Sequence, residues 1–250
     1  VPDDEVVRVG LNGFGRIGRN VFRAVIDHPD LALVGINDVM SFEDMEYLAQ
    51  YDTTMGRLEE VNLDDGQLII GDNAVPLYNI QDPTQLPWGA LNVDVALECT
   101  GIFRTKSDAA AHLEAGASKA IISAPPKGDD PVKQIVYGVN HNEYAGEDVI
   151  SNASCTTNSV TPVAKLLDDE FGIESGLLTT VHAYTGSQAL IDSPMSKTRR
   201  GRAAAENIVP TSTGAAQATT KILPQLEGKL DGMAMRVPVP NGSITELVVS

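Results

Sequence analysis

Short, largely apolar runs alternate with helical patterns in the first part of the chain. Val6 to Leu11 forms one such run, and Leu31 to Ile36 forms the next. Between them, apolar residues recur at helical spacing from Ile17 to Val25, and Pro29 cannot continue that helix. A strand, a helix and a strand within about thirty residues predict a βαβ unit with a right-handed crossover.

The same alternation continues and predicts a doubly wound sheet. Residues 68–70 and 75–77 flank Gly71-Asp72-Asn73, which indicates a hairpin. We also expect strands at 93–97 and 120–123 and helices at 42–50 and 107–115. The pattern therefore predicts an α/β domain of the Rossmann type over residues 1–154.

The pattern of apolar and polar residues changes after residue 154. A helix is expected from Thr156 to Phe171, with an apolar side made of Val160, Val163, Leu166 and Leu167. The stretch 185–208 is polar and aperiodic, and a loop of that length is usually functional. Further expected elements are strands at 177–181, 233–237 and 244–249 and a helix at 214–226. Residues 155–250 are therefore predicted to form an α+β catalytic domain with a mixed, mostly antiparallel sheet.

Composition narrows the class of protein. The two cysteines are too few for a disulfide framework and indicate a reducing compartment, with Cys99 read as a small buried residue. No apolar run is long enough for a membrane span and no signal segment opens the chain, so we expect a cytoplasmic protein. The net charge of -16 argues against nucleic-acid or membrane partners. The dispersed acids also favour a salt-adapted, halophilic organism, because salt screens their repulsion, the alternative being an ordinary solvated acidic surface.

A glycine motif follows the first predicted strand. Gly13 permits a tight turn, Gly15 lets a pyrophosphate approach the backbone, and Gly18 lets the next helix pack on the sheet. Free N–H groups at that helix start would hold the phosphates. Asp38 would accept hydrogen bonds from the adenosine ribose and repel a 2′-phosphate. The motif predicts a dinucleotide site that favours NAD, the alternative being an ordinary turn with a surface aspartate.

Cys155 lies in "SNASCTTNS", where a helix is expected to begin. A helix N-terminus favours negative charge and can lower the pKa of a thiol. Of the four histidines, His182 ends a strand in the same predicted domain, whereas His28 and His141 lie in turns. His112 is expected on a surface helix. Cys155 and His182 are the candidate nucleophile and base, the alternative being a buried cysteine and a strand-capping histidine.

Five motifs appear in order along the chain. They are "NGFGRIGR" at Asn12–Arg19, "ASCTTN" at Ala153–Asn158, "HAYTG" at His182–Gly186, "PTSTGAA" at Pro210–Ala216 and "MRVPVPN" at Met235–Asn241. Together they resemble the phosphorylating glyceraldehyde-3-phosphate dehydrogenase family over nearly the whole chain. The resemblance implies oxidation of glyceraldehyde 3-phosphate with NAD and inorganic phosphate to 1,3-bisphosphoglycerate, in glycolysis and gluconeogenesis.

The resemblance also implies roles for particular residues. Cys155 would attack the aldehyde, and His182 would take the proton as hydride leaves and a thioester forms. The attacking phosphate would be held by Ser154, Thr156, Thr213 and Gly214. The substrate's own phosphate would be held by Thr185, Arg202 and Arg236. The NAD cleft would include Gly13, Gly15, Arg16, Ile17, Gly18, Asp38, Thr100, Gly101 and Ser123, and no metal is implied.

Residues 183–208 resemble the family's S-shaped loop at a subunit interface, which implies a homotetramer. Ser187 stands where the family often has aspartate, and Ser193 where NAD-specific members often have leucine. Ser193 leaves secondary use of NADP open. Family members continue past "ITELVVS", so we expect a chain that is incomplete at its C-terminus.

Two other functions stay open on the sequence. Erythrose-4-phosphate dehydrogenase shares the scaffold and the thiol chemistry, and phosphate dependence and aldehyde preference separate the two. A non-catalytic fragment that binds a dinucleotide or a protein partner is the other alternative. Binding of NAD without thioester formation would identify it.

Overall fold

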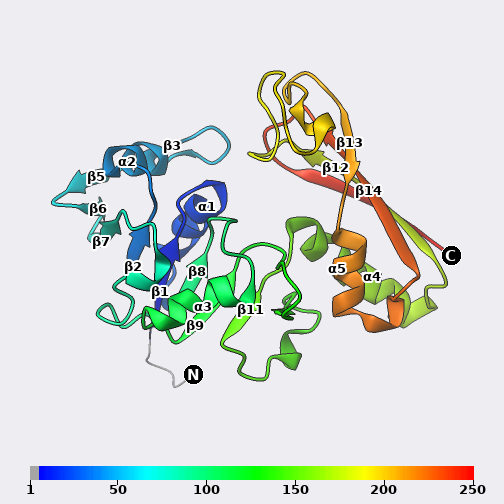
Figure 1. The fold of residues 1–250 in the computed structure, drawn as a ribbon, viewed down its shortest axis with the longest axis horizontal. Helices are drawn as coiled ribbons and strands as arrows, with labels where there is room; N and C mark the ends of the chain where they lie inside the picture. The colour runs from blue at the N-terminus through cyan, green and yellow to red at the C-terminus, as the bar shows by residue number, and fades with distance from the viewer. Residues whose placement is uncertain (1–5) are drawn as a thin grey trace. The chain divides into compact units, whose positions relative to one another are not determined.

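The computed structural model describes residues 6–250, which divide into two compact units (Figure 1). The first unit contains the residues up to Gln134 together with Tyr144–Asn152. The second contains Ile135–Glu143 and Ala153–Ser250, so the boundary is not a single cut at residue 154. Among residues 6–250, no helix has both the length and the apolar character that a membrane span requires.

The first unit is built on a sheet of nine strands, which runs in the order β10-β11-β9-β8-β1-β2-β7-β6-β5. Its strands are β1 Val7–Asn12, β2 Leu31–Asn37, β5 Val61–Asp64, β6 Gln67–Ile70, β7 Asn73–Tyr78, β8 Val95–Glu98, β9 Lys119–Ile122, β10 Lys133–Gln134 and β11 Val149–Ser151. A separate short ribbon pairs β3 Tyr51–Asp52 with β4 Gly56–Arg57. The helices are α1 Arg16–Val25, α2 Phe42–Gln50, α3 Lys106–Glu114 and the 3₁₀ turn η1 Pro83–Gln85.

The strands from β10 to β7 pair in parallel, whereas β7, β6 and β5 are antiparallel. The predicted hairpin is therefore β6–β7, and the prediction of a doubly wound Rossmann-type sheet is confirmed. Parallel pairing brings the ends of β1, β2 and β8 to one edge. There Asn12 lies opposite both Asn37 and Glu98 in the register. Open sheets of this type bind ligands at that edge.

Helix α1 packs on the sheet through an aromatic pair. Phe14 and Phe22 are fully buried, and their rings meet edge to face with centroids 5.4 Å apart. Helix α3 begins with a capping box between Thr105 and Asp108. Its His112 is fully buried, so the expectation of a surface position is wrong. A histidine can be buried when both ring nitrogens have partners, and the sequence of the helix alone does not show such partners.

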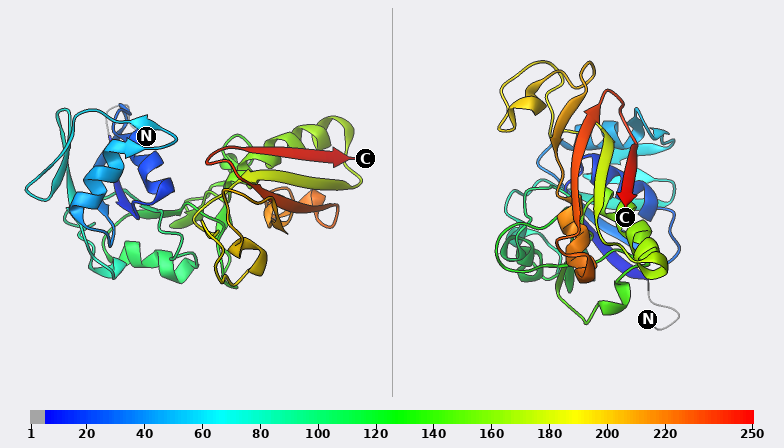
Figure 2. Two further views of the ribbon diagram at one scale, coloured as in Figure 1. Left: turned by 90° about the horizontal axis from the view of Figure 1, so that it is seen from above. Right: turned by 90° about the vertical axis from the view of Figure 1, so that its right-hand side faces the viewer.

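The second unit contains a sheet in the order β13-β14-β12-β15, of which β14, β12 and β15 are seen side by side in Figure 2. Its strands are β12 Gly176–Ala183, β13 Val209–Ser212, β14 Leu230–Val237 and β15 Ser243–Val249. Its helices are α4 Cys155–Phe171 and α5 Ala215–Ile222, with 3₁₀ turns η2 His141–Glu143, η3 Thr198–Gly201 and η4 Pro224–Leu226. Only β12 and β14 pair in parallel, so the predicted mixed, mostly antiparallel sheet is confirmed.

The buried side of α4 differs from the expected one. Val163 is 48% exposed and Leu166 is 61% exposed, whereas threonines of the helix point inward. The Thr161 hydroxyl donates to the Thr157 carbonyl at 2.7 Å and bonds the Thr219 hydroxyl of α5 at 3.1 Å. Because these hydroxyls are satisfied between the two helices, threonine can occupy the core side.

Candidate active site

Cys155 is the first residue of α4 and is exposed. The Ser154 side chain caps the helix by accepting a hydrogen bond from the Thr157 N–H at 3.0 Å. Ala153, which is buried, has a φ of 56°. This left-handed conformation costs an alanine about 1 kcal/mol, and it turns the chain sharply into the helix. The sulfur is thereby fixed at the positive end of α4.

His182, near the end of β12, faces the cysteine. Its Nε2 lies 3.3 Å from the Cys155 Sγ, and its Nδ1 lies 2.8 Å from the Ala183 carbonyl oxygen. A carbonyl only accepts hydrogen bonds, so Nδ1 carries a proton. In the neutral ring the Nε2 lone pair therefore points at the thiol. The structure brings together the two residues that the sequence singles out as nucleophile and base.

The two groups shift each other's pKa. The hydrogen bond to His182 lowers the pKa of Cys155 to about 7, although burial opposes the change. Hydrogen bonds from the Thr156 hydroxyl and backbone lower it further. The same contact with Cys155 raises the pKa of His182. Cys99 differs because burial raises its pKa to about 11, and its expected buried position is confirmed.

Arg236 of β14 lies opposite His182 in the parallel pairing of β14 with β12. Its Nη1 donates to the Ala183 carbonyl at 2.9 Å and to the Thr185 hydroxyl at 3.1 Å. Its Nε is buried and has no hydrogen-bond partner within residues 6–250. Burial lowers the pKa of Arg236, and so does the nearby charge of Arg200. A buried guanidinium with an unused donor is suited to bind an anion.

Arg200, in η3, completes this set of groups. Its Nη1 donates to the Ser187 hydroxyl at 3.0 Å, and its Nε donates to the Thr211 hydroxyl at 3.2 Å. Ser187 in turn bonds the Thr185 hydroxyl at 2.9 Å. Two arginines thus converge on one cluster of hydroxyls.

Arg202, which the resemblance places in this set, is not part of it. Its Nη1 lies 2.8 Å from the Asp192 carboxylate, and its side chain is 61% exposed. Arg200 contacts the cluster of hydroxyls instead. The sequence "TRRGR" offers three arginines in four positions, and only the path of η3 decides which one turns inward.

The residues expected to hold the attacking phosphate lie at two helix starts. Ser154 and Thr156 begin α4, as described above. Gly214 is the N-cap of α5 and provides no side-chain cap, while the Thr213 hydroxyl accepts from the Ala215 N–H at 3.1 Å. Hydroxyls and unpaired N–H groups at helix N-termini are typical ligands of a phosphate.

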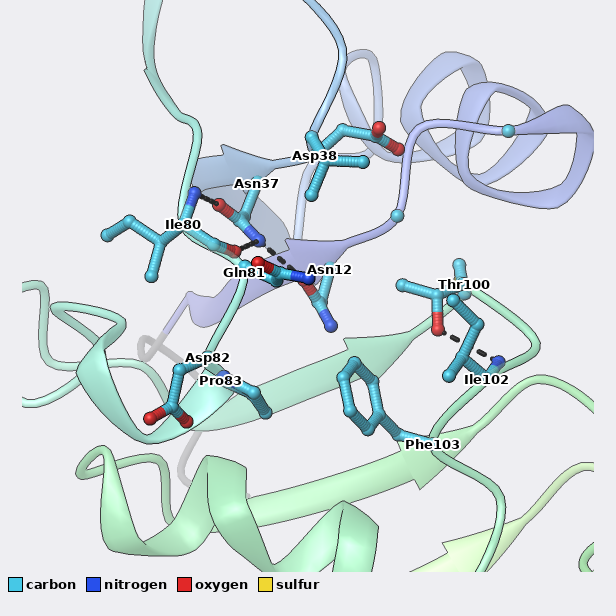
Figure 3. Close-up of a pocket in the computed structure, with 14 residues that line it drawn as sticks. Asn12, Asn37, Asp38, Ile80, Gln81, Asp82, Pro83, Thr100, Ile102 and Phe103 are labelled. Carbon is cyan, nitrogen blue, oxygen red and sulfur yellow. Dashed lines mark hydrogen bonds between the residues drawn. The ribbon is translucent and has the colours of Figure 1, made fainter.

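A cavity of about 800 Å³ opens in the first unit at the ends of β1, β2 and β8 (Figure 3). Gly13, Gly15, Asp38 and Thr100 are among the residues that line it. A Cβ on Gly13, whose φ is 96°, would lie 2.5 Å from the Thr100 nitrogen. A Cβ on Gly15 would meet no atom within 4 Å. The turn therefore leaves open space over Gly15, as the pyrophosphate of a dinucleotide requires.

The other residues expected in the NAD cleft do not line this cavity. The Arg16 guanidinium pairs with Asp52, Ile17 is half exposed, and Gly18 packs on the Gly13 carbonyl. Gly101 has a φ of 72° in the turn after Thr100, and the Ser123 side chain bonds the Cys99 thiol. Their contacts shape the loops around the cavity. Three side chains that line or support the cavity were not identified from the sequence: Asn12, Asn37 and Glu98. Nothing in the sequence shows that these amides and this acid, at the ends of different strands, belong to one site.

The fold and the site define an NAD-dependent dehydrogenase with a cysteine–histidine pair. Residues 7–106 match the model of the glyceraldehyde 3-phosphate dehydrogenase NAD binding domain, and residues 154–250 match the model of its C-terminal domain. The chain belongs to the glyceraldehyde-3-phosphate dehydrogenase family. The expected NAD-dependent oxidoreductase with an NAD-binding domain is thereby confirmed.

Named relatives agree with this assignment. The chain is 70% identical over 247 residues to glyceraldehyde-3-phosphate dehydrogenase of Haloarcula vallismortis, across 98% of this chain and 74% of the relative. It is 53% identical to the enzyme of that name from Streptomyces coelicolor, across 97% of this chain and 73% of the relative. It is 51% identical to glyceraldehyde-3-phosphate dehydrogenase 1 of Bacillus subtilis, across 97% and 72%.

The pKa of Cys155 gives a first prediction. Thiolate is the form that reacts with iodoacetamide, so the alkylation rate should rise with pH through a midpoint near 7. His182→Asn removes the hydrogen bond and should move the midpoint up, toward the value of a free thiol. Cys99→Ser is the matched control and should leave the profile unchanged, because that thiol is buried. An unchanged midpoint in His182→Asn would contradict the assigned pairing.

Proposed function

We propose that the chain oxidises glyceraldehyde 3-phosphate with NAD and inorganic phosphate to 1,3-bisphosphoglycerate. The 3.3 Å contact between Cys155 and His182, beside two arginines on a cluster of hydroxyls, is the observation that carries this proposal. A thiolate serves as the nucleophile for an aldehyde, and the arginines serve a phosphorylated substrate. The reaction belongs to glycolysis and gluconeogenesis.

The side chains have distinct tasks in the first half of the reaction. Cys155 attacks the aldehyde carbon as thiolate, and its own N–H at the start of α4 stabilises the developing oxyanion. His182 passes the proton it took from the thiol to that oxygen. It takes the proton back when the hemithioacetal loses hydride, and a thioester remains on Cys155. The Ala183 carbonyl keeps the imidazole in the required orientation throughout.

Inorganic phosphate completes the reaction by attacking the thioester carbon, and Cys155 leaves as thiolate. We assign this phosphate to the two helix starts at Ser154, Thr156, Thr213 and Gly214. The phosphate of the substrate is assigned to Thr185, Arg200 and Arg236, where the buried Nε of Arg236 offers an unused donor. The charges of the two arginines balance the phosphate, which hydroxyls alone cannot do.

NAD would be held in the cavity of the first unit by the turn at Gly13 and Gly15 and by Asp38, and it supplies the hydride acceptor when bound. Asp38 already accepts hydrogen bonds from the Phe14 N–H at 2.5 Å and the Met40 N–H at 3.1 Å. None of the described residues that line the cavity is basic, so a 2′-phosphate would find no cation there. We therefore propose NAD as the main cofactor, with NADP at most secondary.

The proposed assembly is a homotetramer. Leu177, Met233, Ile244 and Val248 are exposed. The strand register places these four apolar residues on the outer face of the second sheet. The same face also carries Asp231 and Glu246, and exposed apolar side chains gathered on one sheet face are typical of subunit contacts. Light scattering in concentrated KCl should give a mass of four chains, and a mass of one chain would contradict the proposal.

The proposed location is the cytoplasm, and the proposed source is a salt-adapted organism. Both cysteines are free, as a reducing compartment allows. The formal charge of -16 supports adaptation to salt. Erythrose-4-phosphate dehydrogenase is the weaker alternative, because the family models and the relatives named above carry the glyceraldehyde-3-phosphate name.

The two arginines give a further prediction. Arg200→Gln should raise the KM for glyceraldehyde 3-phosphate about tenfold or more, since a charged hydrogen bond contributes about 1.5–3 kcal/mol. Arg202→Gln is the matched control and should change KM less than about twofold, because an exposed ion pair contributes little. Steady-state kinetics check both values. A larger effect at Arg202 would reverse the assignment.

The proposed reaction itself is tested by NADH formation at 340 nm in concentrated KCl. With glyceraldehyde 3-phosphate and NAD, turnover should depend on inorganic phosphate and disappear in Cys155→Ser. Replacing the substrate with erythrose 4-phosphate should lower kcat/KM, and a preference for that aldehyde would favour the alternative enzyme. Binding of NAD with no acylation of Cys155 would instead identify a non-catalytic protein.

A further inference from the structure

A continuous chain of buried side chains runs beneath the cavity of the first unit. It begins at Asn37, passes through Asn12 to Glu98, and ends at His112 and Trp88. These five side chains are at most 3% exposed. The proposed catalysis assigns none of them a role. The row starts at the ends of β2, β1 and β8, where the register places Asn12 between Asn37 and Glu98.

The direction of each hydrogen bond at the Asn37 end follows from a backbone group. The Ile80 N–H donates to the Asn37 Oδ1 at 2.9 Å, so the Asn37 Nδ2 is the donor toward Asn12 at 2.8 Å (Figure 3). Asn12 therefore accepts through Oδ1. Its Nδ2 must then donate to the Glu98 Oε2, at 2.6 Å.

At the other end of this chain of side chains, the indole of Trp88 determines the directions of the hydrogen bonds. Trp88 Nε1 can only donate, and it lies 3.1 Å from the His112 Nδ1. The Nδ1 atom therefore carries no proton, and the ring is neutral with its proton on Nε2. That proton points to the Glu98 Oε2 at 3.1 Å.

The second oxygen of Glu98 also accepts two hydrogen bonds. The Thr100 N–H donates to Oε1 at 2.8 Å, and the Thr100 hydroxyl donates to the same oxygen. The hydroxyl is free to do so because its own lone pair accepts from the Ile102 N–H at 3.0 Å. Three of the four partners can only donate and the hydroxyl is placed to donate as well, so we assign Glu98 as a carboxylate without a proton. Within residues 6–250, no lysine or arginine nitrogen lies within 4.0 Å of it.

Glu98 thus carries a negative charge that is stabilised by hydrogen-bond donors and not by a cation. It lies directly behind side chains that form the wall of the cavity. Asn12 and Thr100, which bond it, both line that cavity. Charges in a buried, poorly solvated position act over longer distances than surface charges. The carboxylate therefore contributes to the potential inside the cavity.

We infer that Glu98 determines the relative affinity of the cavity for the oxidised and reduced cofactor, through the buried network that joins it to Asn12 and Thr100. This inference rests on the proposed binding of NAD. The nicotinamide ring carries a positive charge in NAD and none in NADH. A fixed negative charge stabilises the first form relative to the second. His112 and Trp88 are positioning residues, because they hold the carboxylate without neutralising it.

The test compares Glu98→Gln with Glu98→Asp by fluorescence and calorimetric titration with NAD and with NADH in concentrated KCl. Glu98→Gln should weaken NAD binding roughly three to ten times more than NADH binding, since only the charged ring loses an attraction. Glu98→Asp keeps the charge but disturbs the contacts to Asn12 and Thr100. It should weaken both forms by similar factors.

Equal losses of the two cofactors in Glu98→Gln would overturn the inference and leave a structural role only. Failure of the unsubstituted protein to bind either cofactor would instead contradict the proposed NAD site. A nitrogen-15 NMR measurement on the unsubstituted protein tests the charge assignment without relying on a variant that folds. The ring of His112 should carry a proton on Nε2 and none on Nδ1, and a proton on both nitrogens would overturn the inference.

Discussion

Parallel strand pairing places the chemistry of both units. In the first unit, β1 between β2 and β8 brings the amides of Asn12 and Asn37 and the carboxylate of Glu98 to one edge. In the second unit, the single parallel pair β12–β14 puts Arg236 opposite His182. Parallel neighbours end at the same edge of a sheet. Functional side chains at the ends of different strands therefore lie close together, whatever the loops that connect the strands. The cavity in the first unit and the placement of Arg236 beside His182 both follow from this constraint.

The Ala183 carbonyl contacts both the proposed base and an arginine of the proposed substrate site. It accepts hydrogen bonds from the His182 Nδ1 and the Arg236 Nη1, at 2.8 Å and 2.9 Å. The group that orients the proposed base therefore also orients an arginine assigned to the substrate. A shift of β12 against β14 would disturb both at once. The parallel register along the full length of β12 opposes such a shift.

Much of this could be predicted from local sequence. The glycine turn, the hairpin β6–β7 and the helix start at Cys155 each depend on neighbouring residues, and the structure has them where the sequence predicts them. The inward position of Arg200 rather than Arg202 depends on the path of a 3₁₀ turn. The burial of His112 depends on Trp88 and Glu98, which are distant in sequence. Apolar periodicity also fails on α4, where threonines pair their hydroxyls across to α5.

Only one of the two cysteines is open to oxidation. Cys155 is exposed and its pKa lies near 7, so a large share of it is thiolate at neutral pH. Cys99 is buried with a pKa near 11, and its thiol stays protonated. A peroxide would therefore convert Cys155 to a sulfenic acid and leave Cys99 intact. The ionisation that would prepare Cys155 for its proposed attack on an aldehyde would also make the protein sensitive to oxidative stress.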